Sequence, residues 1–247
     1  MPDDYTSAFR SQQAADRYEK SVYEPDSYDS FVADLQRSWL RDFVSAEFRE
    51  EAPVLHDYAC GTGRIIDSLT GKYRLAHGYD TSADMLAVAA QKGLPAQFHL
   101  IEPGSGPVDV DEQSRGPTLV TMFRLLLNSP QSVRSDSLRF VAGILHQVEH
   151  GVLVLDNHGN RWSLRQAARL KSTPTGVWFH SMSSREVRRQ AAEHGLVVER
   201  RHGFGVVPRS VHGTRLRSLA RTIDRWAAGR RWLAAISIDI VYVARAA

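Results

Sequence analysis

The sequence is poor in the features that mark several classes of protein. Cys60 is its one cysteine among 247 residues, so the chain cannot form an internal disulfide and is no disulfide-stabilised secreted domain. No apolar run approaches the roughly 20 residues that a transmembrane helix needs. The first residues are acidic and polar, unlike the basic and apolar regions of a signal peptide. We therefore expect a soluble protein of the cytoplasm.

Lysine is also scarce: it supplies 4 of the 31 basic residues, and arginine supplies the others. The arginines concentrate in the C-terminal half, above all at about 209–232. There Arg217, Arg221 and Arg225 share one helical face, while a second face is apolar and consists of Leu216, Leu219, Ile223 and Trp226. These arginines suit an anionic acceptor molecule, an RNA, or acidic residues of a second copy in a homodimer. They are equally consistent with a solvated helix face.

Short apolar stretches alternate with helical patterns from residue 54 to residue 244, which predicts an α/β fold with a mostly parallel sheet. We expect strands over 54–58, 75–79, 96–101, 118–123, 152–155, 196–201 and 236–244. Helices are expected over 64–70, 82–92, 135–150, 183–193 and 213–229. The chain is interpreted as one domain, 1–247. It has an N-terminal helical cap (1–52) and an α/β core (53–247) with the Arg-rich helical insertion.

A glycine turn directly follows the first expected strand and reads Asp57-Tyr58-Ala59-Cys60-Gly61-Thr62-Gly63. Glycines at such a turn let the backbone approach a ligand closely, and Asp80, at the end of the second strand, suits ribose hydroxyls. The third glycine of a dinucleotide motif is missing, and Asp57 would repel a pyrophosphate. The pattern therefore favours a cationic adenosine derivative and disfavours a dehydrogenase.

Two stretches resemble motifs of the class I S-adenosylmethionine (SAM) dependent methyltransferases. Residues 57–63 match D-x-A-C-G-T-G, and residues 77–89 match G-x-D-x-S-x-x-M-L-x-x-A. The most typical form of the first motif has a glycine at the position of Ala59, and the alanine here is a common departure from that form. The resemblance implies a Rossmann-like, doubly wound, seven-stranded sheet with helices on both faces. It also implies SAM as cofactor and S-adenosylhomocysteine (SAH) as product.

The same resemblance implies roles for individual residues toward SAM. Asp57 and the backbone of the turn would hold the methionine part, and Asp80 would bind the ribose. One of the cap tyrosines Tyr18, Tyr23 and Tyr28 would face the carboxylate or sulfonium. The full expected set is Asp57, Ala59, Cys60, Gly61, Thr62, Gly63, Asp80, Thr81, Met85, Glu102, Phe123 and Tyr18. Thr81 and Met85 are expected beside the adenine, and Glu102 near its amino group.

The acceptor is expected at the ends of the fourth and fifth strands, because ligands of open α/β sheets bind outside the carboxyl ends of the strands. Two strings follow those strands, F-R-x-L-L-N from Phe123 and N-H-G-N from Asn157, and they look like a bacterial subgroup of SAM methyltransferases. His158 is our candidate general base, with His180 as a second candidate. Arg124, Asn128 and Asn157 are candidates for orienting the acceptor. His158 is also consistent with a histidine that merely stabilises a turn.

We thus predict transfer of the SAM methyl group to an oxygen or nitrogen of a small-molecule acceptor, by in-line displacement. No Cys/His pattern has zinc spacing, so no metal is expected. No membrane partner is expected either. Nucleic acid is disfavoured as a partner because Asn128-Ser129-Pro130 stands where many base-directed enzymes carry N/D-P-P-Y/F. An RNA or protein methyltransferase that uses the Arg-rich helix, a non-catalytic SAM-binding partner subunit and a SAM-binding enzyme without methyl transfer remain as alternatives.

Overall fold

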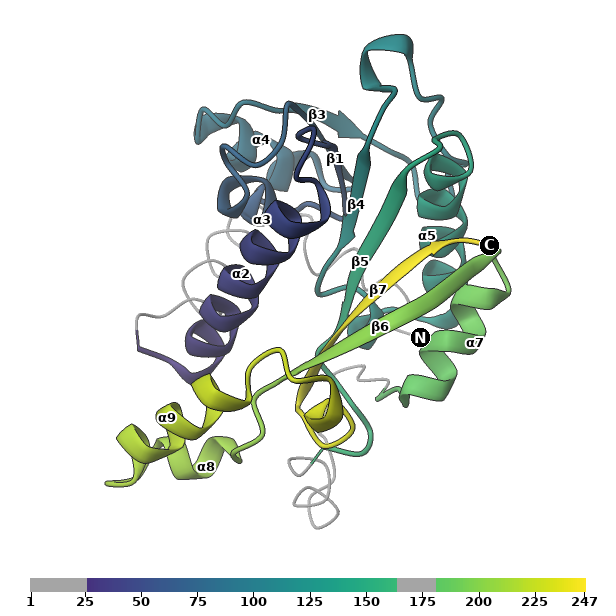
Figure 1. Ribbon diagram of the computed structural model, residues 1–247. Helices are drawn as coiled ribbons and strands as arrows, with labels where there is room; N and C mark the ends of the chain where they lie inside the picture. The colour runs from purple at the N-terminus through teal and green to yellow at the C-terminus, as the bar shows by residue number, and fades with distance from the viewer. Residues whose placement is uncertain (1–25, 164–180) are drawn as a thin grey trace.

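The computed structural model describes residues 26–163 and 181–247, which build one seven-stranded sheet flanked by helices (Figure 1). The strands lie in the order β3-β2-β1-β4-β5-β7-β6. The first five are parallel, and β7 runs antiparallel to both β5 and β6. Their bounds are β1 Val54–Tyr58, β2 Leu75–Asp80, β3 Gln97–Leu100, β4 Thr118–Met122, β5 Gly151–Asn157, β6 Leu196–Phe204 and β7 Asp239–Ala246. The predicted mostly parallel seven-stranded α/β fold is confirmed.

Helices cover both faces of the sheet because the central strands are apolar on both sides. All five residues of β4 are buried, and they alternate between two core layers: Leu119 faces one, Val120 and Met122 the other. The first layer lies under α2 (Tyr28–Glu47), α3 (Arg64–Ser68) and α4 (Ala83–Gln91). The second lies under α5 (Gln131–Leu145) and α7 (Ser184–Ala192), on the opposite side of the sheet (Figure 1).

Hydroxyl caps fix where three of these helices begin. The side chain of Ser27 accepts the N–H of Ser30 at the start of α2, and the predicted cap of α4, Ser82, accepts the N–H of Met85. Helix α7 begins with a reciprocal capping box between Ser183 and Glu186. The Ser82 cap matters for the site, because α4 thereby presents its first turn directly after Asp80.

The structure corrects several predicted boundaries. Helix α5 begins four residues early because Pro130, which needs no N–H partner, serves as its N-cap. The expected helix over 213–229 is shorter in the structure, where it is α9 (Arg217–Ala227), and a short helix that was not predicted, α8 (Arg209–His212), ends just before Gly213. Strand β5 continues through Asn157, because its last residues pair with β7. Three short 3-10 turns complete the elements: η2 Glu112–Ser114, η3 Leu126–Asn128 and η4 Arg231–Leu233.

Two features are absent from residues 26–163 and 181–247. No helix there combines the length and apolar character needed to cross a bilayer. No group of three or more His, Cys, Asp or Glu side chains is arranged to hold a metal ion.

Candidate functional site

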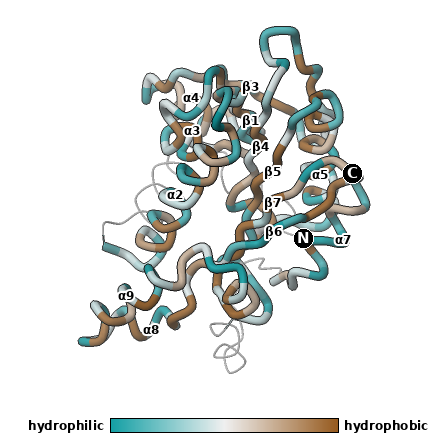
Figure 2. The backbone as a smooth tube through the Cα atoms, viewed as in Figure 1, coloured by the Kyte–Doolittle hydropathy of each residue, from teal (hydrophilic) through white to brown (hydrophobic). Residues whose placement is uncertain are grey.

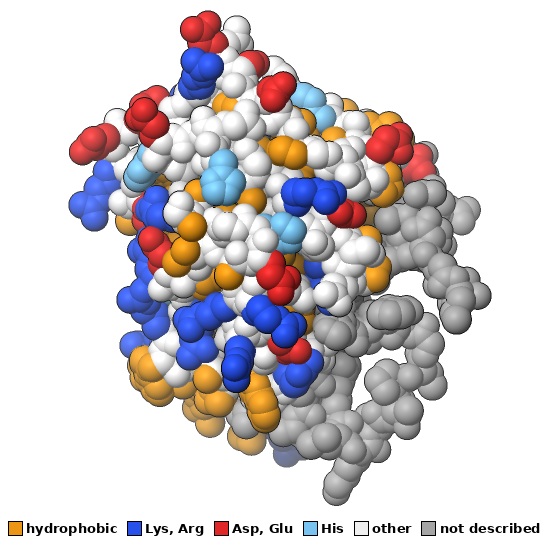
Figure 3. Space-filling view, turned by 90° about the vertical axis from the view of Figure 1, so that its right-hand side faces the viewer, with side chains coloured by type: hydrophobic (Ala, Val, Ile, Leu, Met, Phe, Trp, Pro, Cys, Tyr) orange, Lys and Arg blue, Asp and Glu red, His pale blue; other side chains and the backbone are white. Residues whose placement is uncertain are grey.

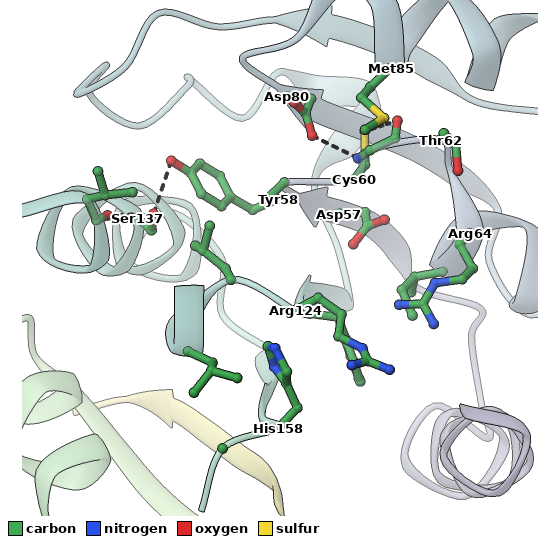
Figure 4. Close-up of a pocket in the computed structure, with 18 of the residues that line it drawn as sticks. Asp57, Tyr58, Cys60, Thr62, Arg64, Asp80, Met85, Arg124, Ser137 and His158 are labelled. Atoms are coloured by element: carbon green, nitrogen blue, oxygen red, sulfur yellow. Dashed lines mark hydrogen bonds between the residues drawn. The ribbon is translucent and has the colours of Figure 1, made fainter. Parts of the chain in front are cut away.

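A cavity of about 560 Å³ opens at the carboxyl ends of the parallel strands. It lies where the strand order reverses, between β1 and β4, which is the usual ligand position in an open α/β sheet. Its walls come from α2, the β1–α3 turn, the end of β2, the segment 101–104, and the segments that follow β4 and β5. Figure 4 shows Asp80 and Met85 at one end of the site, His158 at the other, and Asp57 and Arg124 between them.

The glycine turn forms one wall with a backbone that L-residues rarely adopt. Ala59, Gly61 and Gly63 have φ values of 57°, 54° and 76°. A Cβ atom on Gly61 would meet no atom within 4 Å, so this glycine keeps space open beside the cavity. A Cβ on Gly63 would lie 2.9 Å from Leu94 Cδ1, so this glycine lets the turn pack against the loop after α4. Gly63 itself does not line the cavity.

Cys60, in the middle of the turn, has a buried thiol that contacts the cavity. Burial, together with the nearby carboxylates of Asp57 and Asp80, raises the pKa of this thiol well above its usual value. The thiol therefore stays protonated at neutral pH and is a poor nucleophile.

Asp57 is the most unusual charged group of the site. It stands beside Thr121 of β4 in register, and its Oδ1 accepts the Thr121 hydroxyl at 2.7 Å. Its Oδ2 is buried and has no hydrogen-bond partner in the described parts of the chain. Burial raises the pKa of Asp57 to about 7, against the opposing effects of Thr121 and Arg64. A buried carboxylate with an unused oxygen at a cavity wall is suited to a cationic ligand group.

Asp80 ends β2 and ties the glycine turn to α4. Its Oδ2 accepts the N–H of Gly61 at 2.8 Å, and its Oδ1 accepts the N–H of Ser82 at 2.9 Å. Burial raises its pKa, and these backbone bonds oppose the rise. Each oxygen accepts one backbone N–H here and has a second lone pair, so the carboxylate retains capacity for ligand hydroxyls. Thr81 and Met85 line the same end of the cavity.

The opposite end of the cavity carries an Asp-His pair. Asp156 is fully buried in β5, and its Oδ1 accepts the N–H of Arg124 at 2.6 Å. That bond holds Arg124 at a φ of 62°, which is unfavourable for a side chain of this size. The Oδ2 of Asp156 lies 3.8 Å from Nδ1 of His158, too far for a hydrogen bond but close enough to stabilise an imidazolium.

Eleven of the predicted site residues line this one cavity: Asp57, Ala59, Cys60, Gly61, Thr62, Asp80, Thr81, Met85, Phe123, Arg124 and His158. Besides Gly63, two other predicted residues do not line it. Glu102 is exposed, and its neighbours Ile101 and Pro103 face the cavity in its place. Asn157 is buried in β5, where it donates to the carbonyl of Met182 and accepts the N–H of Gly159, so it shapes a turn instead of facing an acceptor.

The side chains of four predicted residues are not described. Tyr18 and His180 lie outside the described residues, as does Tyr23 of the cap. The backbone of Asn128 belongs to η3, and its side chain is not described.

The cavity also contains residues that sequence reasoning missed. Asp29 comes from α2, Arg64 from the first turn of α3, and Arg209 from the start of α8. Tyr28 of α2 also lines the cavity, and it is one of the three cap tyrosines that the sequence predicted. Asp29 and Arg209 form an ion pair of 3.1 Å that joins α2 to α8 at the cavity wall. Arg64 had a local signal, since it directly follows the glycine turn. The Asp29–Arg209 pair had none, because 180 residues separate its members.

Solved structures match this chain over most of its length, whereas no family model and no curated protein sequence does. Magnesium protoporphyrin IX methyltransferase from Synechocystis PCC 6803, crystallised with bound SAH, is 14% identical with a TM-score of 0.61, covering 99% of this chain and 100% of that one. The CcbJ methyltransferase from Streptomyces caelestis is 18% identical with a TM-score of 0.61, covering 99% of each. The [4+2]-cyclase SpnF is 15% identical with a TM-score of 0.51, covering 84% of this chain and 80% of that one. The chain therefore has the Rossmann-like fold of the class I SAM-dependent methyltransferases.

Proposed function

We propose that this protein transfers the methyl group of SAM to an oxygen or nitrogen atom of a small-molecule acceptor. The observation that carries the proposal is the buried, unpartnered Oδ2 of Asp57 at the wall of the cavity. SAM carries an ammonium group that suits this carboxylate, and a ribose that suits Asp80 at the adjacent strand end. The open space above Gly61 provides room for the ligand between them.

Different residues on the donor side would bind different parts of the cofactor. Asp57 would accept from the ammonium group, Asp80 from the ribose hydroxyls, and Met85 would pack beside the adenine. Arg64 lines the cavity at the first turn of α3 and is the cation suited to the methionine carboxylate. When bound, SAM would supply a methyl group activated by its sulfonium for in-line displacement.

On the acceptor side, His158 would take the proton that an acceptor hydroxyl loses as it attacks, or the proton that an acceptor ammonium group must lose before its nitrogen can attack. Asp156 would stabilise the charged imidazole from 3.8 Å. Arg124 would orient the acceptor, and its guanidinium favours an anionic one. Holding the nucleophile in line with the methyl group would supply much of the rate enhancement.

A small acceptor fits better than an RNA or a protein. The Arg-rich helix was the sequence basis for the macromolecular alternative, but Arg217 and Arg221 both bind Asp26. One alternative, a SAM-binding enzyme without methyl transfer, remains open. The fold is similar to that of SpnF, which is named a [4+2]-cyclase, so this fold also serves other chemistry. Binding and turnover therefore need separate tests.

Calorimetric titration of SAM and SAH into the wild type, Asp80→Ala and Glu102→Ala tests the donor site. Loss of the Asp80 contacts should cost about 1.5–3 kcal/mol, or roughly 10- to 150-fold in affinity. Glu102→Ala removes an exposed carboxylate next to the cavity wall and should leave affinity unchanged. A folded wild type that binds neither ligand, or an Asp80→Ala variant that binds as well as wild type, would refute the proposed site. Consumption of SAM with candidate acceptors then separates a methyltransferase from a binding protein.

A further inference from the structure

Helix α9 turns part of an apolar face toward solvent. Its inner residues Ala220, Asp224 and Ala227 are buried. Residues at helical spacing beside them are exposed: Leu216 by 58%, Leu219 by 57%, Ile223 by 40% and Trp226 by 55%. Trp232, just after α9, is 67% exposed, and its ring lies 6.0 Å from that of Trp226. We call these five exposed side chains the α9 patch.

The surroundings of the α9 patch are strongly basic. The segment 209–236 contains seven arginines and a single acidic residue, Asp224. Asp224 is fully buried, where it accepts the N–H groups of Val206 and Val207 and contacts His212 Nε2 at 2.9 Å. The segment therefore shows no carboxylate to solvent.

Three exposed arginines stand at the two ends of the patch. Arg215 precedes α9, and Arg230 and Arg231 follow it. The Arg230 guanidinium lies 4.3 Å from the centre of the Trp226 ring. In the described parts of the chain, none of the three has a carboxylate within ion-pair distance.

The patch lies at one end of the molecule. Figure 1 places α8 and α9 at the lower margin, away from the strands β1–β3, and Figure 2 shows brown, apolar residues along this segment. At the lower end in Figure 3, a band of blue basic side chains lies directly above a group of orange apolar ones. Apolar and basic groups are thus presented together on one protruding element.

We propose that the α9 patch docks the protein on the surface of an anionic lipid bilayer. A helix with an exposed apolar face bordered by arginines and with low overall hydrophobicity lies in the interface plane, with its apolar side in the acyl boundary. Tryptophan rings are suited to that depth, and arginines bind lipid phosphates at the rim. The patch would rest on the bilayer, not cross it. The expectation of no membrane partner considered only spanning segments, and the proposal differs from it.

The charge distribution favours a bilayer over the other occupants. In a symmetric dimer through α9, the arginine rims of the two copies would meet each other, and the segment has no exposed carboxylate to compensate. An RNA would match the arginines but would leave Leu219 and Ile223 without an apolar partner. Anionic lipid matches both the apolar side chains and the charges. This proposal does not depend on the activity proposed for the cavity.

Sedimentation with vesicles tests the proposal on the full-length protein at about physiological ionic strength. Vesicles of phosphatidylcholine alone and vesicles with one quarter phosphatidylglycerol would be compared. We expect binding to the anionic vesicles, a blue shift of tryptophan fluorescence and weaker binding in high salt. Leu219→Ser/Ile223→Ser should bind at least tenfold more weakly. Arg215→Gln/Arg231→Gln should lose roughly fivefold per arginine.

Val197→Ser is the matched control, because Val197 is a 52% exposed apolar residue on β6 outside the patch, and its binding should equal wild type. All variants replace exposed side chains, and circular dichroism with thermal unfolding verifies their folding. Equal binding to both vesicle types, or none to either, would overturn the proposal. So would a wild-type dimer in light scattering that Leu219→Ser/Ile223→Ser converts to monomer, which would assign the patch to a second copy. Binding to poly-glutamate without vesicle binding would point instead to an acidic protein.

Discussion

At the level of single residues, backbone strain coincides with the cavity. Among the described residues, Asp26, Ala59 and Arg124 are the non-glycine residues with positive φ, and the last two line the cavity. Each is held by a neighbour. Cys60, which follows Ala59, donates its N–H to the Tyr79 carbonyl at 3.0 Å. The carboxylate of Asp156 accepts the N–H of Arg124. The fold thus holds two unfavourable conformations in place where a ligand would make contact.

Replacing Ala59 with glycine should stabilise the protein. The left-handed conformation costs a side-chain-bearing residue about 1–2 kcal/mol, and glycine loses about 0.5–1 kcal/mol of that gain through its more flexible unfolded chain. We expect Ala59→Gly to raise the free energy of unfolding in urea by about 0.5–1 kcal/mol. Ala87→Gly is the control, since it lies on the exposed side of helix α4 and should destabilise by a similar amount. Equal destabilisation by both variants would contradict the strain argument.

The titration of Asp57 should make cofactor affinity depend on pH. Its pKa in the free protein is raised to about 7 by burial, and an ammonium group favours the ionised form. Below pH 7 the carboxyl must first lose its proton, so the Kd for SAH should rise up to tenfold per pH unit as pH falls. Calorimetry between pH 8 and pH 5.5 measures the slope. Asp57→Asn should bind weakly and with a flatter slope, and an unchanged slope in that variant would assign the titration to another group.

At the level of elements, three histidines form a layer on one face of β1, β2 and β3. His56 Nδ1 lies 3.0 Å from the Tyr79 hydroxyl, and His77 Nδ1 lies 3.1 Å from His99 Nε2. The rings of His56 and His77 are stacked at 5.0 Å. Burial lowers the pKa of all three, that of His56 to about 3. The layer is therefore composed of neutral imidazoles.

This layer should make the sheet sensitive to acid. The unfolded chain binds protons at these histidines below about pH 6.5, and the native protein does not. These histidines therefore leave the free energy of unfolding unchanged above pH 6.5. They lower it progressively as pH falls from 6.5 toward 3, because protons then bind the unfolded chain preferentially. His56 alone should account for about 2 kcal/mol of lost stability at pH 5. Urea unfolding at pH 7 and pH 5 measures this loss, which His56→Gln should reduce. His146→Gln, at an exposed histidine, should leave it unchanged; a loss equal to wild type in His56→Gln would contradict the mechanism.

The sequence predicted the elements whose signals are local. The strand β4 could be predicted because its residues are apolar throughout, and the turn 57–63 because its glycines directly follow a strand. The short helix α8 was missed, because its four residues are too few to show a helical pattern in the sequence. Asn157 was misplaced because its pairing with Ile240 of β7, 83 residues away in the chain, extends β5 beyond the apolar stretch.

At the scale of the whole molecule, contacts between distant segments complete the site. The helix α2 is held to the C-terminal segment by Asp29 with Arg209 and by Asp26 with Arg217 and Arg221. The sequence predicted a cap over the cofactor but not these partners, because nothing local indicates which of 27 arginines an aspartate will meet. The donor half of the cavity was predictable from one continuous stretch of chain, whereas the wall formed by α2 and α8 depends on how these two distant helices pack together.

Ligand binding should therefore stabilise α2 together with the glycine turn. SAH at a hundred times its Kd should stabilise the native state by about 2.7 kcal/mol, which corresponds to a rise in Tm of roughly 5–10 °C. Because Tyr28, Asp29 and Val32 line the cavity, hydrogen exchange in α2 should slow together with exchange in the turn 57–63. Helix α7 packs on the opposite face of the sheet, and its exchange should slow only to the extent that the whole protein is stabilised. Protection of the turn without any in the first turn of α2 would mean that α2 is not a wall of the cofactor site.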